Sequence, residues 1–255
     1  MLKKLLILIC GVAFLTLVVF VINNSGASNS NEEDYQLVDA LRAGVHFDVK
    51  NMGYQQYYDD SPVGFEIELA ELLAKYIYGE STLLELTSVS TKTAKYYLND
   101  KTIDCIIATQ PLPSLESKEY KYSKPYYTDY VELYSKDTIL SLNNLEGKTI
   151  AVITDSYAKS ALESLLTSSK INASLVTYES YDDGLHAVQI GKADAFCGNR
   201  AFVATTTLKR FTVTTCEYAI MVRSSDSGLL SKLNIALDAI TNSGELKALQ
   251  EKYKK

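Results

Sequence analysis

A loop that follows a short apolar run holds the residues of this chain that are best placed to contact a ligand. The run Cys105–Ala108 has the composition of a buried strand. Pro111 and Pro113 in the loop after it neither continue a central strand nor enter a helix interior. In an α/β sheet, ligands bind at loops that leave the carboxyl ends of strands, so residues 109 to 116 are the first candidates for a binding site. This loop contributes Thr109, Gln110, Pro111 and Glu116.

The start of an expected helix supplies a second group of candidates. Asp155, Ser156 and Tyr157 follow an apolar run and open a helical pattern, with Asp or Ser available as the N-cap. Backbone N–H groups at a helix N-terminus favour an anion. Asp155 competes for these groups, so the sequence leaves open how much anion binding this end retains.

Acid–base catalysis and metal binding have weaker support in the sequence. Glu116 is an acid in the candidate loop and could serve as a general acid if burial raised its pKa. We find no second catalytic partner at a persuasive position. His46 and His186 are far apart, and no group of His, Cys or carboxylates has the spacing of metal ligands. We therefore expect neither a metal nor another cofactor.

Short apolar runs and apolar residues at helical spacing predict the strands and helices that position these loops. The βαβα order predicts a mostly parallel sheet with helices on both faces. Expected strands cover 43–47, 83–89, 104–108, 130–135, 149–153, 174–178, 193–197 and 217–222. Expected helices cover 65–77, 91–98, 155–166, 181–190, 229–241 and 244–253.

The net charge of −6 argues against a nucleic-acid partner.

The N-terminal segment predicts export. Lys3 and Lys4 precede the apolar run Leu5–Ile22, which is long for a signal peptide and at the lower limit for a membrane span. Lysines at the front keep the N-terminus cytoplasmic, so the remainder is exported. We favour an uncleaved anchor followed by a polar tether, with cleavage near Ala27 as the alternative.

Three cysteines, Cys105, Cys197 and Cys216, lie beyond this leader, so at least one of them is unpaired. A bridge between Cys197 and Cys216 is one alternative, because both lie in strand-like runs of the same half. We favour buried free thiols, because Cys packs as a small hydrophobe.

Five motifs in a fixed order resemble the extracellular solute-binding proteins of the polar amino acid family, bacterial family 3, which serve ATP-driven importers. The resemblance covers most of residues 40–255. It implies an α/β fold of the periplasmic-binding-protein type 2 class, with two lobes of mixed sheets joined by two hinge strands. The motifs are Val63–Ala70 (VGFEIELA), Asp104–Tyr127, Leu145–Val152 (LEGKTIAV), Gly191–Ala195 (GKADA) and Ser243–Leu246 (SGEL).

The same resemblance implies the domain organisation. Residues 1–34 form the signal or anchor and its tether. Residues 35–130 and 220–255 form the first lobe, and residues 131–219 form a second lobe inserted into it. The ligand site is then expected between the lobes.

The chain departs from the family at both charged anchors. In the family, an arginine from the first lobe clamps the ligand carboxylate with its bidentate fork, and an aspartate from the second lobe holds the ammonium group. These positions correspond to Glu116 and Asn199 here. Each charge-assisted hydrogen bond is worth roughly 1.5–3 kcal/mol, so both losses disfavour an ordinary zwitterion. Arg200 could instead hold an anion from the second lobe; surface solvation is the alternative, because Arg is mostly exposed.

Aromatic residues provide the last candidates. Phe47, Tyr54 and Tyr57 correspond to positions where the family places aromatic rings over the ligand side chain. With Glu116 they would suit a cationic or amine ligand. The alternatives are core packing for Phe47 and solvent exposure for the two tyrosines.

The resemblance implies a monomeric, membrane-tethered substrate-binding protein on the extracellular face of the cell, which delivers a small solute to an ABC permease. The solute is expected to be an amino acid, a modified amino acid, an amine or a short peptide. The missing anchors favour an alternative, a sensor or interaction protein that keeps the fold without transport. An enzyme of dehydratase or lytic type is a third hypothesis, and we expect the chain not to be an enzyme.

Overall fold

The computed structural model describes residues 40–57, 60–80, 83–112, 117–203 and 206–253. One eight-stranded sheet has the strand order β4-β1-β5-β10-β6-β9-β7-β8, and β2 and β3 form a separate hairpin. The strands are β1 Ala40–Val45, β2 Asp48–Val49, β3 Gly53–Tyr54, β4 Leu83–Ser88, β5 Cys105–Ile106, β6 Tyr120–Ser135, β7 Thr149–Ile153, β8 Ser174–Tyr178, β9 Ala195–Asn199 and β10 Lys209–Arg223. The α-helices are α1 Phe65–Tyr78, α2 Ala94–Asn99, α3 Tyr157–Ser169, α4 Tyr181–Gln189, α5 Ser227–Ser243 and α6 Glu245–Tyr253, and short 3₁₀ helices η1 and η2 cover Leu142–Leu145 and Arg200–Phe202.

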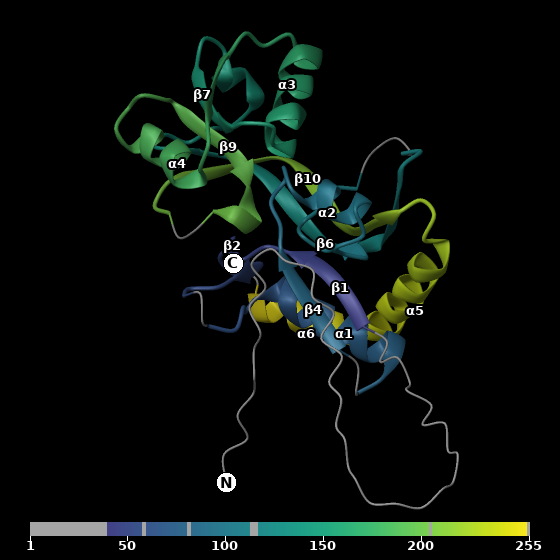
Figure 1. The fold of residues 1–255 in the computed structure, drawn as a ribbon. Helices are drawn as coiled ribbons and strands as arrows, with labels where there is room; N and C mark the ends of the chain where they lie inside the picture. Colours follow the sequence, from purple (N-terminus) through teal and green to yellow (C-terminus); the bar gives the residue numbers. More distant parts are fainter. Residues whose placement is uncertain (1–39, 58–59, 81–82, 113–116, 204–205, 254–255) are drawn as a thin grey trace, which may run out of the picture. The chain divides into compact units, whose positions relative to one another are not determined.

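Two long antiparallel strands, β6 and β10, join two groups of parallel strands (Figure 1). In one group β4, β1 and β5 run parallel to one another. In the other group β8, β7 and β9 run parallel to one another. This mixed sheet with two joining strands is the two-lobed α/β fold that the resemblance implies.

The registers show that the carboxyl ends of both groups point to the middle of the β6–β10 ribbon. β5 runs antiparallel to β10 and pairs with it at Met221, near the carboxyl end of β10. β9 pairs with the other end of the ribbon, where its first residue, Ala195, lies opposite Ser135 and its last, Asn199, opposite Val131. Since each group runs inward from its own end, the loops that follow their strands meet at the centre.

Alternation of side chains along the strands places helices on both faces of each group. In the first group Cys105 and Ile107 belong to the core that includes α1, whereas Ile106 and Ala108 pack with Leu98 of α2. In the second group the same alternation separates the residues that pack on α3 from those that pack on α4. Successive residues of a strand point to opposite faces, so a strand buried by helices on both sides reads as a continuous apolar run.

Most strand and helix positions agree with the sequence prediction, and β6 is the largest difference. We expect a strand over 130–135, but β6 begins at Tyr120 and includes Pro125. The partner strand β10 continues beside this whole segment, and the register shifts next to Pro125, which pairs with Ala219. An irregularity of this kind accommodates a residue that lacks an N–H donor.

The expected membrane anchor, residues 1–34, lies outside the described residues. Within the described part of the chain, no helix is long and apolar enough to cross a membrane. Cys105, Cys197 and Cys216 are buried free thiols in this structure.

Candidate functional site

A cavity of about 220 Å³ lies where the carboxyl ends of the two strand groups meet. His46, which follows β1, and two short segments after β4 and β5 form one wall. The loop after β7, the start of α4 and the end of β9 form the other wall, and Tyr218 of β10 lies between them. The lining residues are His46, Ser90, Thr91, Ala108–Pro111, Ile153–Tyr157, Tyr181, Asn199, Phe202 and Tyr218.

The structure brings seven of the twelve candidate binding residues together in this cavity: Thr109, Gln110, Pro111, Asp155, Ser156, Tyr157 and Asn199. Four others, Phe47, Tyr54, Tyr57 and Arg200, are not among its lining residues. The remaining candidate, Glu116, lies outside the described residues.

The loop after β5 is held in an unusual backbone conformation. Thr109 has a φ of 37°, which is strained for a β-branched residue. The loop is fixed on both sides, because Gln110 Nε2 donates to the Ala108 carbonyl at 2.7 Å and the Gln110 carbonyl accepts from Ala219 N at 3.0 Å. Strain of this kind is retained where the surrounding structure imposes it, and it is common at binding sites.

The loop after β7 has a matching feature on the opposite wall. Asp155 has a φ of 53°, in the left-handed region that Asp tolerates better than most residues. Ser156 is the N-cap of α3 and accepts a hydrogen bond from Lys159 N at 3.1 Å. The cavity therefore receives the N-terminal end of a 13-residue helix together with one carboxylate.

Asn199 ends β9 and lines the cavity with a buried amide. The residue is 4% exposed. Burial raises the pKa values of the Asp129 carboxyl and the Cys216 thiol, and a hydrogen bond from the Asn199 side chain acts in the opposite direction on both. The backbone N–H of Asn199 donates to the hydroxyl oxygen of Tyr181 at 3.3 Å. Asn199 therefore lines the cavity with a side chain that also interacts with Asp129 and Cys216.

His46 is the basic group of the described lining. Its Nδ1 lies 3.0 and 3.2 Å from the two carboxylate oxygens of Glu66, and its backbone N–H donates to the same carboxylate at 2.8 Å. Burial lowers the pKa of His46, but the charge of Glu66 and its hydrogen bond outweigh burial, so the pKa is raised above its ordinary value. Gly53 fits against this pair, because a Cβ there would lie 2.1 Å from the His46 carbonyl oxygen.

The sequence profile of the bacterial extracellular solute-binding proteins, family 3, matches residues 41–255. The chain belongs to this family. The match includes all the segments that line the cavity.

The chain is also similar to individual proteins of known name or structure. The glutamine-binding protein of Geobacillus stearothermophilus is 30% identical over 165 residues, which cover 64% of this chain and 62% of that protein. The arginine-binding extracellular protein ArtP of Bacillus subtilis (strain 168) is 28% identical over 249 residues, which cover 92% of this chain and 93% of that protein. A crystal structure of the ancestral amino acid-binding protein AncCDT-1, a precursor of cyclohexadienyl dehydratase, has a TM-score of 0.72 at 24% identity and covers 85% of this chain and 95% of that one, which shows a shared fold.

Sequence reasoning did not select several lining residues of this family 3 protein, most clearly His46, Thr91, Tyr181 and Phe202. His46 and Thr91 each follow closely after a strand. The rule that ligands bind at the carboxyl ends of strands could have found both. Tyr181 and Phe202 stack with ring centroids 5.2 Å apart, a contact that the sequence alone does not reveal.

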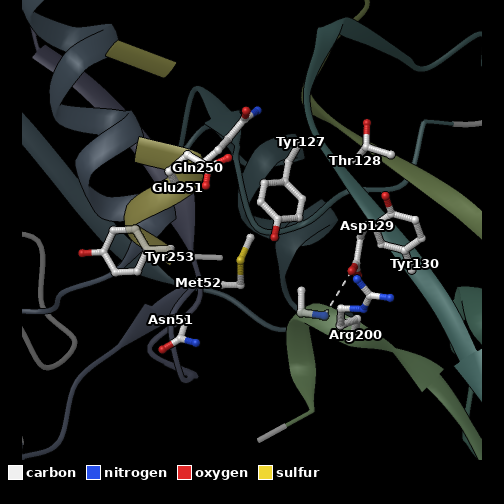
Figure 2. Close-up of a pocket in the computed structure, with 11 residues that line it drawn as sticks. Asn51, Met52, Tyr127, Thr128, Asp129, Tyr130, Arg200, Gln250, Glu251 and Tyr253 are labelled. Carbon is white, nitrogen blue, oxygen red and sulfur yellow. Dashed lines mark hydrogen bonds between the residues drawn. The ribbon is translucent and has the colours of Figure 1, made fainter. Parts of the chain in front are cut away.

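Arg200 lines a second cavity of about 240 Å³, together with Asp129 and Tyr130 (Figure 2). Its guanidinium forms an ion pair with Glu132 and lies 4.2 Å from the ring centroid of Tyr130. Arg200 is therefore engaged at the β6 strand and is neither simply solvated nor part of the first cavity.

The three aromatic candidates occupy different surroundings from the cavity. Phe47 packs against the hydrophobic core. The ring of Tyr54 lies 5.9 Å from the Lys50 ammonium nitrogen, and Tyr57 is 67% exposed. In this structure the aromatic walls of the cavity are instead Tyr157, Tyr181, Phe202 and Tyr218.

Proposed function

We propose that this family 3 protein binds an amino-acid-like solute outside the cell and delivers it to the permease of an ABC importer. One observation carries the proposal: a single cavity is lined by both strand groups at their carboxyl ends. A solute in this cavity would contact both groups and stabilise the arrangement in which they face each other. Two of the relatives are a glutamine-binding protein and an arginine-binding protein, which supports the amino-acid class.

The two long strands β6 and β10 are the proposed hinge. They connect the two groups, so a small change of backbone dihedral angles in their central residues would open or close the cavity. The domain boundaries that we predict, near residues 130 and 220, fall within these strands. In this proposal the N-terminal segment, residues 1–34, tethers the protein to the membrane.

In this proposal the cavity binds a solute and does not catalyse a reaction on it. Asp155 and His46 are its charged groups among the described lining residues, and no hydrogen bond joins them. His46 is already engaged by Glu66, so the cavity lacks a free acid–base pair of the kind that general catalysis requires. We therefore place the chain with the binding proteins and not with the dehydratase whose ancestor shares its fold.

Thermal unfolding of residues 30–255 with a panel of solutes tests the proposal. The panel contains L-glutamine, L-arginine, L-cystine, a diamine and a dipeptide. A solute at 100 times its Kd stabilises the protein by about 2.7 kcal/mol, which raises the Tm by several degrees. Asn199→Ala should reduce this shift, while Asn51→Ala in the second cavity should leave it unchanged. A folded protein with no shift for any solute would contradict the proposed function.

A further inference from the structure

The charges of the cavity are arranged with one basic and one acidic side chain on opposite walls. Among the described lining residues, His46 is the one basic side chain and Asp155 is the one carboxylate. His46 follows β1, whereas Asp155 follows β7, so each belongs to a different strand group. A solute that spans the cavity therefore meets a basic side chain at one wall and an acidic side chain at the other.

Glu66 fixes which nitrogen of His46 remains for a ligand. Both carboxylate oxygens lie within 3.2 Å of Nδ1, so this nitrogen donates to Glu66. The carboxylate is fully buried, and the His46 side chain is 11% exposed. Because Nδ1 is engaged, Nε2 is the ring nitrogen that remains for the cavity, and a buried carboxylate beside the ring favours the form in which Nε2 carries a proton.

A series of contacts connects His46 with Asn199. The His46 ring meets Phe202 at nearly right angles, with centroids 5.8 Å apart. Phe202 stacks on Tyr181, and the Tyr181 hydroxyl accepts from Asn199 N. His46 and Asn199 thus line the same cavity with an aromatic pair between them.

We propose that the His46 ring, held by Glu66, donates from Nε2 to a carboxylate group of the solute. This inference rests on the proposed function and names the group that the cavity recognises. The amino group of the solute then lies toward Asp155. The protonated His46 ring, held by the Glu66 carboxylate, then has the role that an arginine guanidinium often has at a carboxylate site.

The charged and titratable groups around His46 support a response to pH in the neutral range. Glu66 of α1 contacts the ring directly, and the charge of Asp48 on β2 acts in the same direction. Phe202, from η2, carries no charge. Across the cavity, burial raises the pKa values of Tyr157, Tyr181 and Tyr218, which therefore stay neutral near pH 7. His46 is thus the group of the described lining that is expected to lose its charge as the pH rises, at a pKa above its ordinary value.

Nuclear magnetic resonance of the imidazole groups gives the first test, because the chain has two histidines. His186→Asn, at an exposed position, assigns the signals and serves as the control. The pKa of His46 should exceed 6.5 in the free protein and fall in Glu66→Gln. Addition of L-glutamine or L-arginine should raise it further, since a bound carboxylate favours the protonated ring. If neither amino acid binds, acetate titrated to 100 mM is the probe, and it should raise the same pKa.

Calorimetric titration with matched solutes gives the second test. Whichever amino acid binds should bind about tenfold to a hundredfold more tightly than its carboxyl amide, L-glutaminamide or L-argininamide. His46→Asn, which can still donate to Glu66, should remove this preference, and wild-type affinity should fall as the pH rises above the pKa of His46. Equal binding of acid and amide overturns the inference but leaves the proposed function intact. A His46 pKa that responds to neither the amino acids nor acetate overturns it as well, whereas a response to acetate alone supports it and counts against the proposed function.

Discussion

Two buried glutamates, Glu66 and Glu132, each hold a base, and each base meets an aromatic ring. Glu66 is fully buried and holds His46 at 3.0 Å, and the His46 ring contacts Phe202. Glu132 is 1% exposed and holds Arg200, whose guanidinium lies over the ring of Tyr130. The two arrangements use the same parts but differ in the base.

The basic residue determines whether each pair stays charged as the pH changes. Arginine stays charged at every pH at which a protein is folded, whereas histidine loses its proton near neutrality. Burial raises the pKa of Glu132, but hydrogen bonds from Arg200 and Tyr134 outweigh burial and leave it lowered. The ion pair of Glu132 and Arg200 therefore connects β6 with η2 and keeps its charges over the pH range of the folded protein. The pair of Glu66 and His46 can change its charge at the edge of the cavity.

The largest expected effect comes from breaking the permanent pair. Arg200→Met leaves the Glu132 carboxylate buried, with the Tyr134 hydroxyl at 2.8 Å as its main remaining donor. Removing one partner of a buried pair costs about 3–5 kcal/mol. Because the Arg200 side chain is 28% exposed, we expect a loss of about 2–3 kcal/mol in the free energy of unfolding, measured in urea at pH 7.

Two variants control this measurement. Lys192→Met changes an exposed position and should alter stability by about 0.5 kcal/mol or less. Adding Glu132→Gln to Arg200→Met should restore part of the loss, because the buried charge is gone. If Arg200→Met were as stable as the wild type, the ion pair would not stabilise the contact between β6 and η2.

A smaller effect is expected from the titratable pair, as a dependence of stability on pH. The folded pKa of His46 is raised above the unfolded value of about 6.5. The pair therefore contributes its full stability below pH 6.5, and this contribution is lost as the pH rises through the folded pKa. Each unit of difference corresponds to about 1.4 kcal/mol. Urea unfolding between pH 5.5 and 8.5 should show this loss in the wild type and not in His46→Asn.

The contribution of Arg200 provides the contrast over the same pH range. The pKa of Arg200 is raised and that of Glu132 is lowered, so neither group titrates between pH 5.5 and 8.5. The cost of Arg200→Met should therefore be the same at both ends of the range. A cost that varies as much as that of His46→Asn would show that the two pairs do not differ as proposed.

Local patterns in the sequence predict the strand ends of the cavity well. Apolar runs predict β7 and β8 at their observed bounds. The loops that follow β5 and β7 are then candidate sites by position, and Thr109 and Asp155 do lie in one cavity. These predictions succeed because a strand, its end and the loop after it are consecutive in the chain.

The two glutamate pairs could not be predicted in the same way. Glu66 is 20 residues from His46, and Glu132 is 68 residues from Arg200. Only the packed structure brings these groups together. Arg200 follows Asn199 directly, yet the two residues line different cavities, because η2 begins at Arg200 and turns the chain. Side-chain direction at the end of a strand depends on that turn and not on the sequence spacing.

The smallest expected effect comes from removing the Tyr130 ring, and it measures the contact of this ring with Arg200 apart from the ion pair with Glu132. Arg200 lies 4.2 Å from the centroid of Tyr130, a ring that is 37% exposed. A cation–π contact at such a site is worth about 0.5–1 kcal/mol, so Tyr130→Leu should lower the free energy of unfolding by about that amount. Tyr130→Phe keeps the ring and should retain most of the stability. In the Arg200→Met background, Tyr130→Leu should cost less than in the wild type, because the cation is absent. An equal cost in both backgrounds would assign the effect of Tyr130 to packing and leave the ion pair as the sole attachment of Arg200 to β6.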